Sequence, residues 1–444
     1  MLDAASAGGS PAAKPFTDDS QIHSYRAYNQ TAYVPLVSDL LPPAPSRPLR
    51  WSATTAAVAL ALMLTSCAGS DDSNDDAASS STSSSPTTSA GSTAGTGDVV
   101  ALAEAFAATL SDDQKTALNQ DYTFENATNW SNLPNALLTG GGGAPGGGTG
   151  GAPSGGPPGG GAPSGGAPGG GSTSTGRVGL QTDSLSDEQW TALEDLLAAA
   201  TGSAENEGFD EIVQHLQADD YLADSGGGDD YGRGNYFIAF LGTPADTGTW
   251  ELQFGGHHLA VANTYVDGAL AGATPSFRGI EPFTTVEVDG DTVQPEQQEA
   301  AAFSALLTSL DTDQLATATL SESYNDLLLG PGKDWAFPAT AEGLLGSELT
   351  DDQKALLLAA INTYVADVAD ADAAAILARY ESEVDDTHVA FSGSTDMTQQ
   401  GDYIRIDGPS VWIEFSQQNG IVLSGAHPHA VWRDKQTDYA GTTS

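Results

Sequence analysis

The chain has 444 residues and carries 59 acidic side chains against 14 Lys and Arg, so its formal net charge at pH 7 is −45. Affinity for nucleic acids comes mainly from Lys and Arg that displace counterions from phosphates, so this charge excludes non-specific binding to DNA or RNA. It also disfavours anionic membrane surfaces. With 39% hydrophobic residues the chain can still build a core, and its length fits one large domain or two small ones.

The only targeting-like stretch ends at Cys67, the single cysteine of the chain. Arg47 and Arg50 precede the uncharged stretch Trp51–Leu64, which is too short to span a bilayer comfortably. The stretch ends in Leu64-Thr65-Ser66-Cys67 and resembles a bacterial lipoprotein signal. That resemblance implies cleavage before Cys67, lipidation of Cys67, and an extracytoplasmic protein anchored to the cell membrane. The alternative is a buried structural cysteine that follows a hydrophobic helix.

Two low-complexity segments flank the signal and interrupt the chain. Residues 1–46 form an extension before the signal, for which we prefer a misassigned upstream start over a cytoplasmic extension. Residues 67–98 are rich in Ser, Thr, Gly, Ala and Asp and predict a tether with nothing to bury. Gly140–Gly176 contains 20 Gly and six Pro without any charge, which indicates a flexible linker or loop. Composition leaves open whether it separates two domains or interrupts one.

Four short motifs predict helix starts. In each, a Ser, Thr or Asp precedes a Gln by three positions, which is the capping-box spacing, and the acids between them suit the positive end of a helix. The alternative is that these acids bind metal. The motifs are Ser111–Gln114, Ser186–Gln189, Asp311–Gln314 and Thr350–Gln353.

The pattern switches to alternating polar and apolar residues in two later regions, which predicts strands. Turn signals such as Asp267-Gly268 and Asp407-Gly408-Pro409 separate them. Helices and hairpins without strict alternation favour an α+β fold with a largely antiparallel sheet. The predicted strands are Asn235–Leu241, Thr249–Phe254, His258–Val266, Phe283–Val288, His388–Ser392, Asp402–Ile406, Val411–Ser416 and Gly420–Ser424.

Histidines gather in these β regions and predict a metal site. His427 and His429 share one face of an extended strand, about 7 Å apart, so both could bind one ion. His257 and His258 would point to opposite faces of an extended segment, so at most one of them joins the pair. Three imidazoles with an open fourth position are typical of catalytic zinc, and another divalent transition metal is equally compatible. The alternative is surface or structural histidines, which is the interpretation we prefer for His388.

Charged residues near these histidines are candidates for catalysis. Glu414 lies within the strand Val411–Ser416 and is a candidate general base or fourth ligand, and the alternative is an acid that faces outward. Asp434 is a second candidate for proton transfer. Arg433, like Arg233, Arg278 and Arg405, lies in or beside a β motif, where it either pairs with a carboxylate or faces an anionic ligand.

Several motifs in one order resemble the bacterial family catalogued as domain of unknown function 3500. They are Tyr236–Pro244, Trp250–Leu259, Asp267–Pro275, Tyr403–Pro409, Val411–Phe415 and His427–Asp434. The resemblance covers roughly Val99 to Gly441. It implies one domain over residues 99–444, in which 140–176 is a disordered insertion, because the family has only a short segment there. It transfers a fold and candidate positions, without an activity.

Two classes of function fit these observations. The first is a metal-dependent hydrolase that acts on a small molecule, in which His257 or His258, His427 and His429 bind the ion and Glu414 or Asp434 moves protons. The second is a non-catalytic surface lipoprotein that binds a ligand or a metal. No nucleophile elbow or phosphate-binding loop is present. Both hypotheses require that the segment Phe254–Leu259 folds beside His427–Asp434 if the metal site exists.

Overall fold

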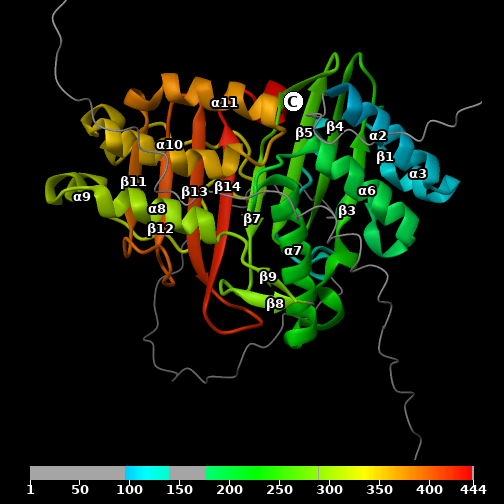
Figure 1. Cartoon of the computed structure of the whole chain (residues 1–444), viewed down its shortest axis with the longest axis horizontal. Coiled ribbons are helices and arrows are strands. Elements are labelled where there is room, and N and C mark those ends of the chain that lie inside the picture. The colour runs from blue at the N-terminus through cyan, green and yellow to red at the C-terminus, as the bar shows by residue number, and fades with distance from the viewer. Residues whose placement is uncertain (1–95, 140–175, 289, 443–444) are drawn as a thin grey trace, which may run out of the picture. The chain divides into compact units, whose positions relative to one another are not determined.

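A mixed sheet runs through the chain and carries helices on one face (Figure 1). The computed structural model describes residues 96–139, 176–288 and 290–442. Within these residues the sheet has 12 strands, and only the β1–β3 pairing is parallel. This confirms the predicted α+β fold with a largely antiparallel sheet. The predicted extension and signal peptide, almost all of the tether, and residues 140–175 of the predicted insertion lie outside the described residues.

The strands follow each other in space in the order β1-β3-β4-β5-β7-β14-β13-β12-β11-β10, with β2 paired to β3 and β6 to β5. Two further strands, β8 and β9, form a separate hairpin. The strands are β1 (Asn119–Gln120), β2 (Leu180–Gln181), β3 (Phe237–Leu241), β4 (Thr249–Gly256), β5 (Leu259–Val266), β6 (Ala269–Gly272), β7 (Ser276–Gly279), β8 (Val286–Val288), β9 (Asp291–Val293), β10 (Leu344–Leu345), β11 (His388–Ser392), β12 (Tyr403–Asp407), β13 (Val411–Asn419) and β14 (Ala426–Asp434).

The helices supply most of the residues that cover the sheet. None of the helices in the described part of the chain is both long and apolar enough to cross a membrane. The α-helices are α2 (Thr96–Thr109), α3 (Asp112–Leu118), α4 (Phe124–Ala127), α5 (Asn135–Leu138), α6 (Asp187–Ala200), α7 (Gly208–Leu222), α8 (Gln297–Ser309), α9 (Thr312–Ala318), α10 (Asp351–Val365) and α11 (Asp370–Ser382).

All four predicted capping boxes start a helix, namely α3, α6, α9 and α10. The box glutamines also pair across helices, which the sequence did not reveal. Gln114 and Gln189 exchange two side-chain hydrogen bonds of 3.1 and 3.0 Å. Gln314 and Gln353 form the same pair at 3.0 and 2.9 Å. The boxes therefore fix the position of one helix start against another as well as the start itself.

The described residues contain the same arrangement twice. In the first half α2, α3 and α6 precede the strands β3, β4, β5 and β7, and in the second half α8, α9 and α10 precede β11, β12, β13 and β14. The parallel contact of β1 with β3 recurs as an isolated bridge between Thr319 and Phe391. Gly179 and Gly343 occupy matching places with φ of +108° and +104°, where a Cβ would clash with the carbonyl of the paired strand. The domain is therefore an internal repeat.

The two halves join where β7 pairs with β14 in the middle of the sheet. Helices α2 and α6 pack on the strands of the first half, and α8 and α10 pack on those of the second, all on one face (Figure 1). The opposite face carries a smaller apolar cluster that includes Trp130, Phe277, Val431 and Tyr439. The ends of the central strands therefore lie between two packed layers that belong to different halves.

One predicted strand is wrong. Gly420–Ser424 is the connection between β13 and β14, and the strand proper begins at Ala426. The backbone N–H groups of Val422 and Leu423 donate to the buried Glu281 carboxylate at 2.7 and 2.6 Å instead of to a neighbouring strand. The alternating apolar residues therefore reflect a loop that is held by one side chain.

Glu251 on β4 gives a test of the core. It is fully buried, and it accepts hydrogen bonds from Gln253 and Thr264 at 2.9 Å each. Burial raises the pKa of Glu251 to about 7, against 4.5 in an exposed glutamate.

We expect Glu251→Gln to remove a pH dependence of the free energy of unfolding. Between pH 4.5 and 7 folded Glu251 keeps a proton that the unfolded chain releases, so its contribution to stability is lost as pH rises through this window. The Gln variant should gain up to about 3 kcal/mol relative to wild type between pH 4.5 and pH 8. Denaturant unfolding of both proteins across this range measures the difference, and two parallel stability curves would contradict the prediction.

Candidate metal centre

The turn between β4 and β5 places two histidines at the end of the sheet. His257 and His258 form the two-residue turn, and His258 has a left-handed backbone with φ of 64°. Three contacts hold the turn: the Tyr236 hydroxyl donates to the His257 carbonyl at 2.7 Å, Arg177 donates to the Gly256 carbonyl at 2.7 Å, and the His258 N–H donates to the Asn132 carbonyl. The strained residue is therefore supported on all sides.

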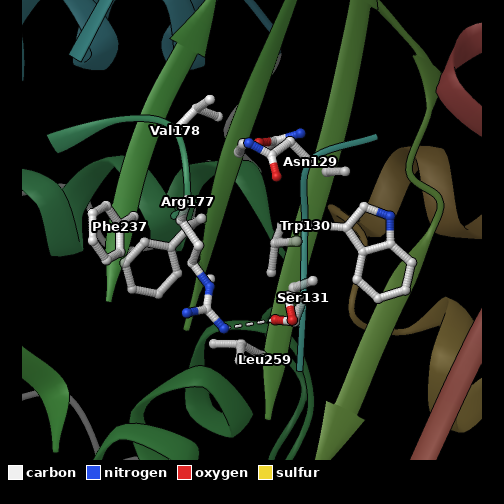
Figure 2. Close-up of a pocket in the computed structure, with 13 residues that line it drawn as sticks. Asn129, Trp130, Ser131, Arg177, Val178, Phe237 and Leu259 are labelled. Atoms are coloured by element: carbon white, nitrogen blue, oxygen red, sulfur yellow. Dashed lines mark hydrogen bonds between the residues drawn. The ribbon is translucent and has the colours of Figure 1, made fainter. Parts of the chain in front are cut away.

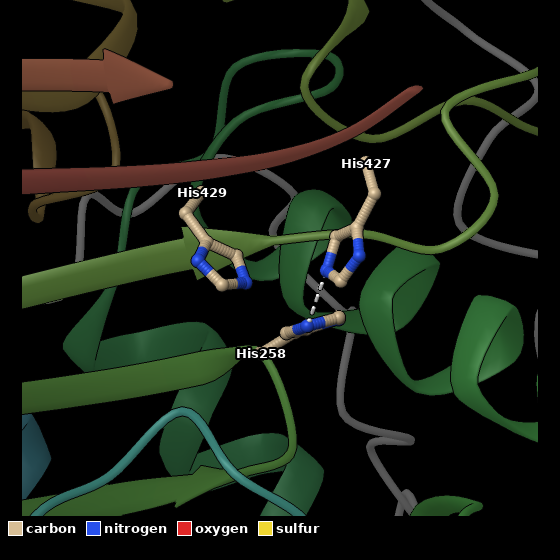
Figure 3. Close-up of side chains that lie close together, drawn as sticks. All are labelled: His258, His427 and His429. Atoms are coloured by element: carbon tan, nitrogen blue, oxygen red, sulfur yellow. Dashed lines mark hydrogen bonds between the residues drawn. The ribbon is translucent and has the colours of Figure 1, made fainter. Parts of the chain in front are cut away.

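Figure 3 shows that His258, His427 and His429 point toward one another. The Nε2 atoms of His258 and His427 lie 2.8 Å apart, and Nε2 of His429 is buried without a hydrogen-bond partner. One nitrogen from each ring lies within 4.8 Å of the other two. Two nitrogens about 2.05 Å from a tetrahedral ion lie about 3.3 Å apart, so small ring rotations would complete such a site. The three imidazoles could hold a metal ion.

Carboxylates stand behind two of these rings. Asp326 lies 3.1 Å from Nδ1 of His429, and Glu281 lies 3.8 Å from Nδ1 of His427. A histidine that binds metal through one nitrogen commonly donates its other N–H to a carboxylate, which fixes the ring and increases its basicity. His429 has this arrangement, while the longer Glu281 contact requires a small movement to form a hydrogen bond.

Burial keeps the rings neutral. It lowers the pKa of His258 and of His427 well below the ordinary value of 6.5, and the neighbouring imidazoles lower both further. A neutral imidazole offers a lone pair to a metal, whereas an imidazolium offers none. These two rings are therefore ready to bind an ion at neutral pH without releasing a proton.

His257 is not a member of this group. Its Nδ1 lies 2.6 Å from the Asp219 carboxylate on α7, and its ring stacks on His258 with centroids 3.6 Å apart. The expectation that the two rings point to opposite faces is wrong, because the pair lies in a turn and not in an extended strand. His257 instead fixes the ring of His258 from behind. His388 lies away from the site, at the start of β11.

Two cavities lie near the turn. A small one of about 30 Å³ lies beside Arg177 and Ser131, whose contact Figure 2 shows. A larger one of about 610 Å³ is lined by acidic side chains, Arg233 and Tyr231. The Tyr231 ring also packs edge-on against His257, with centroids 4.8 Å apart. The larger cavity therefore shares a wall residue with the surroundings of the three histidines.

Glu414 has a different environment from the one expected of a metal ligand or an outward-facing acid. It is fully buried, and its two oxygens accept hydrogen bonds from the backbone of Leu328 and Leu329, from the Tyr403 hydroxyl and from Trp412. Four donors saturate a carboxylate. The structure uses Glu414 to hold the segment around Leu328 on the sheet and does not bring it to the three histidines.

Asp434 and Arg433 are likewise engaged elsewhere. Asp434 accepts hydrogen bonds from Arg379 and from the Tyr380 hydroxyl on α11. Arg433 is fully buried and pairs with Asp334 and Asp438 at 3.0 and 2.9 Å. The other three arginines also have carboxylate partners, namely Asp220 for Arg233, Glu211 and Asp367 for Arg278, and Glu342 for Arg405.

Comparison with known proteins gives one match. Residues 172–441 match the family described as Protein of unknown function (DUF3500). The chain belongs to this family. Neither the curated proteins nor the solved structures contain a match. The helix α2, which lies before the matched residues, packs on α6 within them, so the DUF3500 fold of this chain includes residues that precede the match.

Sequence reasoning missed the residues that support the DUF3500 histidines. Asp219 and Asp326 are among many acids of the chain, and they reach His257 and His429 only through the fold, across 38 and 103 positions. Asp219 did carry a signal, because it lies four residues after His215 on α7, in a helix with a buried polar face.

Gly279→Ala should weaken metal binding by the DUF3500 domain. A Cβ on Gly279 would lie 3.2 Å from Cδ2 of both His258 and His429 and 3.0 Å from the Pro428 carbonyl. The rings would have to move apart, so we expect at least a tenfold loss of zinc affinity with the helices still folded. Titration with zinc, monitored by calorimetry, measures this. Gly330→Ala is the matched control, because its Cβ would meet only Leu327 at 3.9 Å, and equal losses in both variants would contradict the prediction.

Proposed function

We propose that this protein binds zinc or another divalent transition metal through His258, His427 and His429. The observation that carries the proposal is the convergence of three buried imidazoles, of which two present Nε2 atoms 2.8 Å apart and the third a Nε2 without a partner. Imidazole suits zinc, copper, iron and nickel. The single cysteine of the chain lies outside the described residues, so nitrogen and oxygen ligands are the ones that the described fold supplies.

We further propose that the ion activates water for hydrolysis of a small molecule. Three protein ligands leave a fourth position, and a bound divalent ion lowers the pKa of water enough to make hydroxide at neutral pH. Asp326 is better placed to move the proton than Glu414 or Asp434, because it already contacts His429 and its side chain is 60% exposed. The 610 Å³ cavity beside Tyr231 is the candidate substrate site, and its acidic lining favours cationic or hydroxyl-rich substrates.

A non-catalytic metal-binding lipoprotein is the second candidate function. The burial of the ligands favours it, since His258, His427 and His429 are only 5%, 1% and 8% exposed. A storage or structural ion needs no open position, whereas a catalytic one does.

For either function we propose an exported protein that is anchored to the membrane through lipidated Cys67. The two arginines, the apolar stretch and the terminal Cys67 support this location.

The combined change His427→Ala and His429→Ala should remove bound metal while the helices stay folded. Elemental analysis of the purified protein measures occupancy, and circular dichroism measures the helices. His388→Ala is the matched control, because His388 is a partly buried strand histidine outside the group. Full occupancy in the double variant would end the proposal. The same proteins separate the two functions, since a hydrolase should turn over ester, phosphoester or amide substrates only with metal present and a binding protein should turn over none.

Cys67→Ala should abolish lipidation and membrane association without unfolding the domain, since Cys67 lies outside the described core. Fractionation and mass spectrometry of the membrane fraction measure both. An unmodified Cys67 peptide that continues into Ser66 would contradict the predicted cleavage.

A further inference from the structure

A second group of ionisable side chains lies on the buried stripe of α7. Glu207, Glu211, His215 and Asp219 follow each other at intervals of four residues, so they share one side of the helix. Asp219 contacts His257, as described above. The other three face the start of α8, where Glu296 precedes the helix and Glu299 lies in its first turn.

These side chains form two overlapping groups that meet at Glu211. One group is Glu211, His215 and Glu296, and the other is Glu207, Glu211 and Glu299. In each group one ligand atom per residue lies within 4.8 Å of the others. Ligands at about 2.0 to 2.6 Å from a common ion lie about 3 to 5 Å apart, so each group has room for one cation.

The ligand atoms are buried and have no donors. Glu211, Glu296 and Glu299 are 0%, 0% and 1% exposed. Oxygens of all three, and Oε2 of Glu207, have no hydrogen-bond partner among the described residues. This contrasts with Glu414, whose four donors were described above. Buried carboxylate oxygens without donors are costly, and they point to an absent positive partner.

His215 gives an independent indication of a cation. Its Nδ1 lies 2.9 Å from the backbone carbonyl of Glu211, so Nδ1 carries the hydrogen and Nε2 presents its lone pair. That Nε2 is buried without a partner and lies 3.6 Å from Oε1 of Glu296. Two acceptors that face each other repel unless a positive charge lies between them. A backbone carbonyl on the far nitrogen is also the common support of a metal-bound histidine.

The charge of the region supports the same conclusion. Five carboxylates, those of Glu207, Glu211, Glu296, Glu299 and Asp367, surround a single guanidinium, that of Arg278, which pairs with Glu211 and Asp367. If all were ionised the formal charge would be −4, and two divalent cations would neutralise it. Burial raises the pKa of Glu207 to about 10 and those of Glu211 and Glu299 well above 4.5, so without cations these groups would take up protons instead.

A tyrosine hydroxyl completes the surroundings. Tyr364 on α10 is 1% exposed, and its hydroxyl has no hydrogen-bond partner. The carboxylates of Glu296, Glu299 and Glu211 act on it electrostatically, which places it beside the group. A water bound to a cation would give this hydroxyl a partner.

We propose that Glu207, Glu211, His215, Glu296 and Glu299 bind a pair of divalent cations, with Glu211 as the bridging ligand. Four carboxylates and one imidazole suit a hard ion that also accepts nitrogen, and Mn²⁺ fits this combination better than Zn²⁺ or Mg²⁺. The centre, which we call the carboxylate centre, shares no ligand with the three histidines. It is therefore distinct from the site of the proposed function and stands or falls without it.

Titration of the full chain, stripped of metal, with Mn²⁺ alone tests the proposal. The His427→Ala and His429→Ala background removes the other site. We expect two Mn²⁺ per chain by calorimetry, a rise in melting temperature on binding, and an exchange-coupled Mn²⁺ signal in electron paramagnetic resonance. Glu211→Gln should weaken binding at least a hundredfold and abolish the coupled signal, because it removes the shared ligand. Glu205→Gln, an exposed acid two residues before the group, should bind as the background protein does.

Results that overturn the proposal are equally definite. The background protein could bind no Mn²⁺, or Glu211→Gln could bind as tightly as Glu205→Gln, which would show that protons alone neutralise the carboxylates. Should Glu211→Gln fail to fold, anomalous diffraction at the manganese edge from wild-type crystals grown with Mn²⁺ decides the question. Two peaks between α7 and α8 support the pair, and none refutes it.

Discussion

The pairing of β7 with β14 is the constraint on which the two candidate sites depend. It joins the halves of an internal repeat and sets His429 opposite Gly279. Because Gly279 has no side chain, the hairpin turn with His258 can approach His429 across it. On the helix side, Arg278 of the same strand reaches Glu211 of α7 and Asp367 of the second half. Any shift of this register by one residue would exchange the two faces and separate both groups of ligands.

Helix α7 connects the two sites by one stripe of polar residues. Its middle provides Glu211 and His215 to the carboxylate centre, and Asp219, two turns further on, holds His257 behind the three histidines. A helix is a rigid spacer, with a rise of about 1.5 Å per residue, so the distance between the sites is set by residue number alone. In a protein with a net charge of −45, most acids lie in solvent, and this stripe is the exception that the fold buries.

Local patterns could be predicted from the sequence, and long-range ones could not. The four capping boxes are fixed by contacts across three positions, so they were visible, as was the shared face of His427 and His429. The choice of His258 over His257 depends on a left-handed turn residue, which alternation does not encode. Asp326 and Glu414 were beyond prediction, because the partners that define them lie 80 or more positions away. The carboxylate centre had a visible signal on α7, but its other half lies on α8.

The internal repeat has a consequence for the order of folding. His258 and His427 are separated by 169 positions, and they meet only when both halves are formed and joined. An ion bound there closes a long loop of chain, and since the unfolded chain has no such site, its binding free energy adds directly to that of the joined state. Each half can form its local helices and hairpins early, whereas the join is a distant contact with a high entropic cost. Metal supply would thus set how long the two halves stay together once they have met.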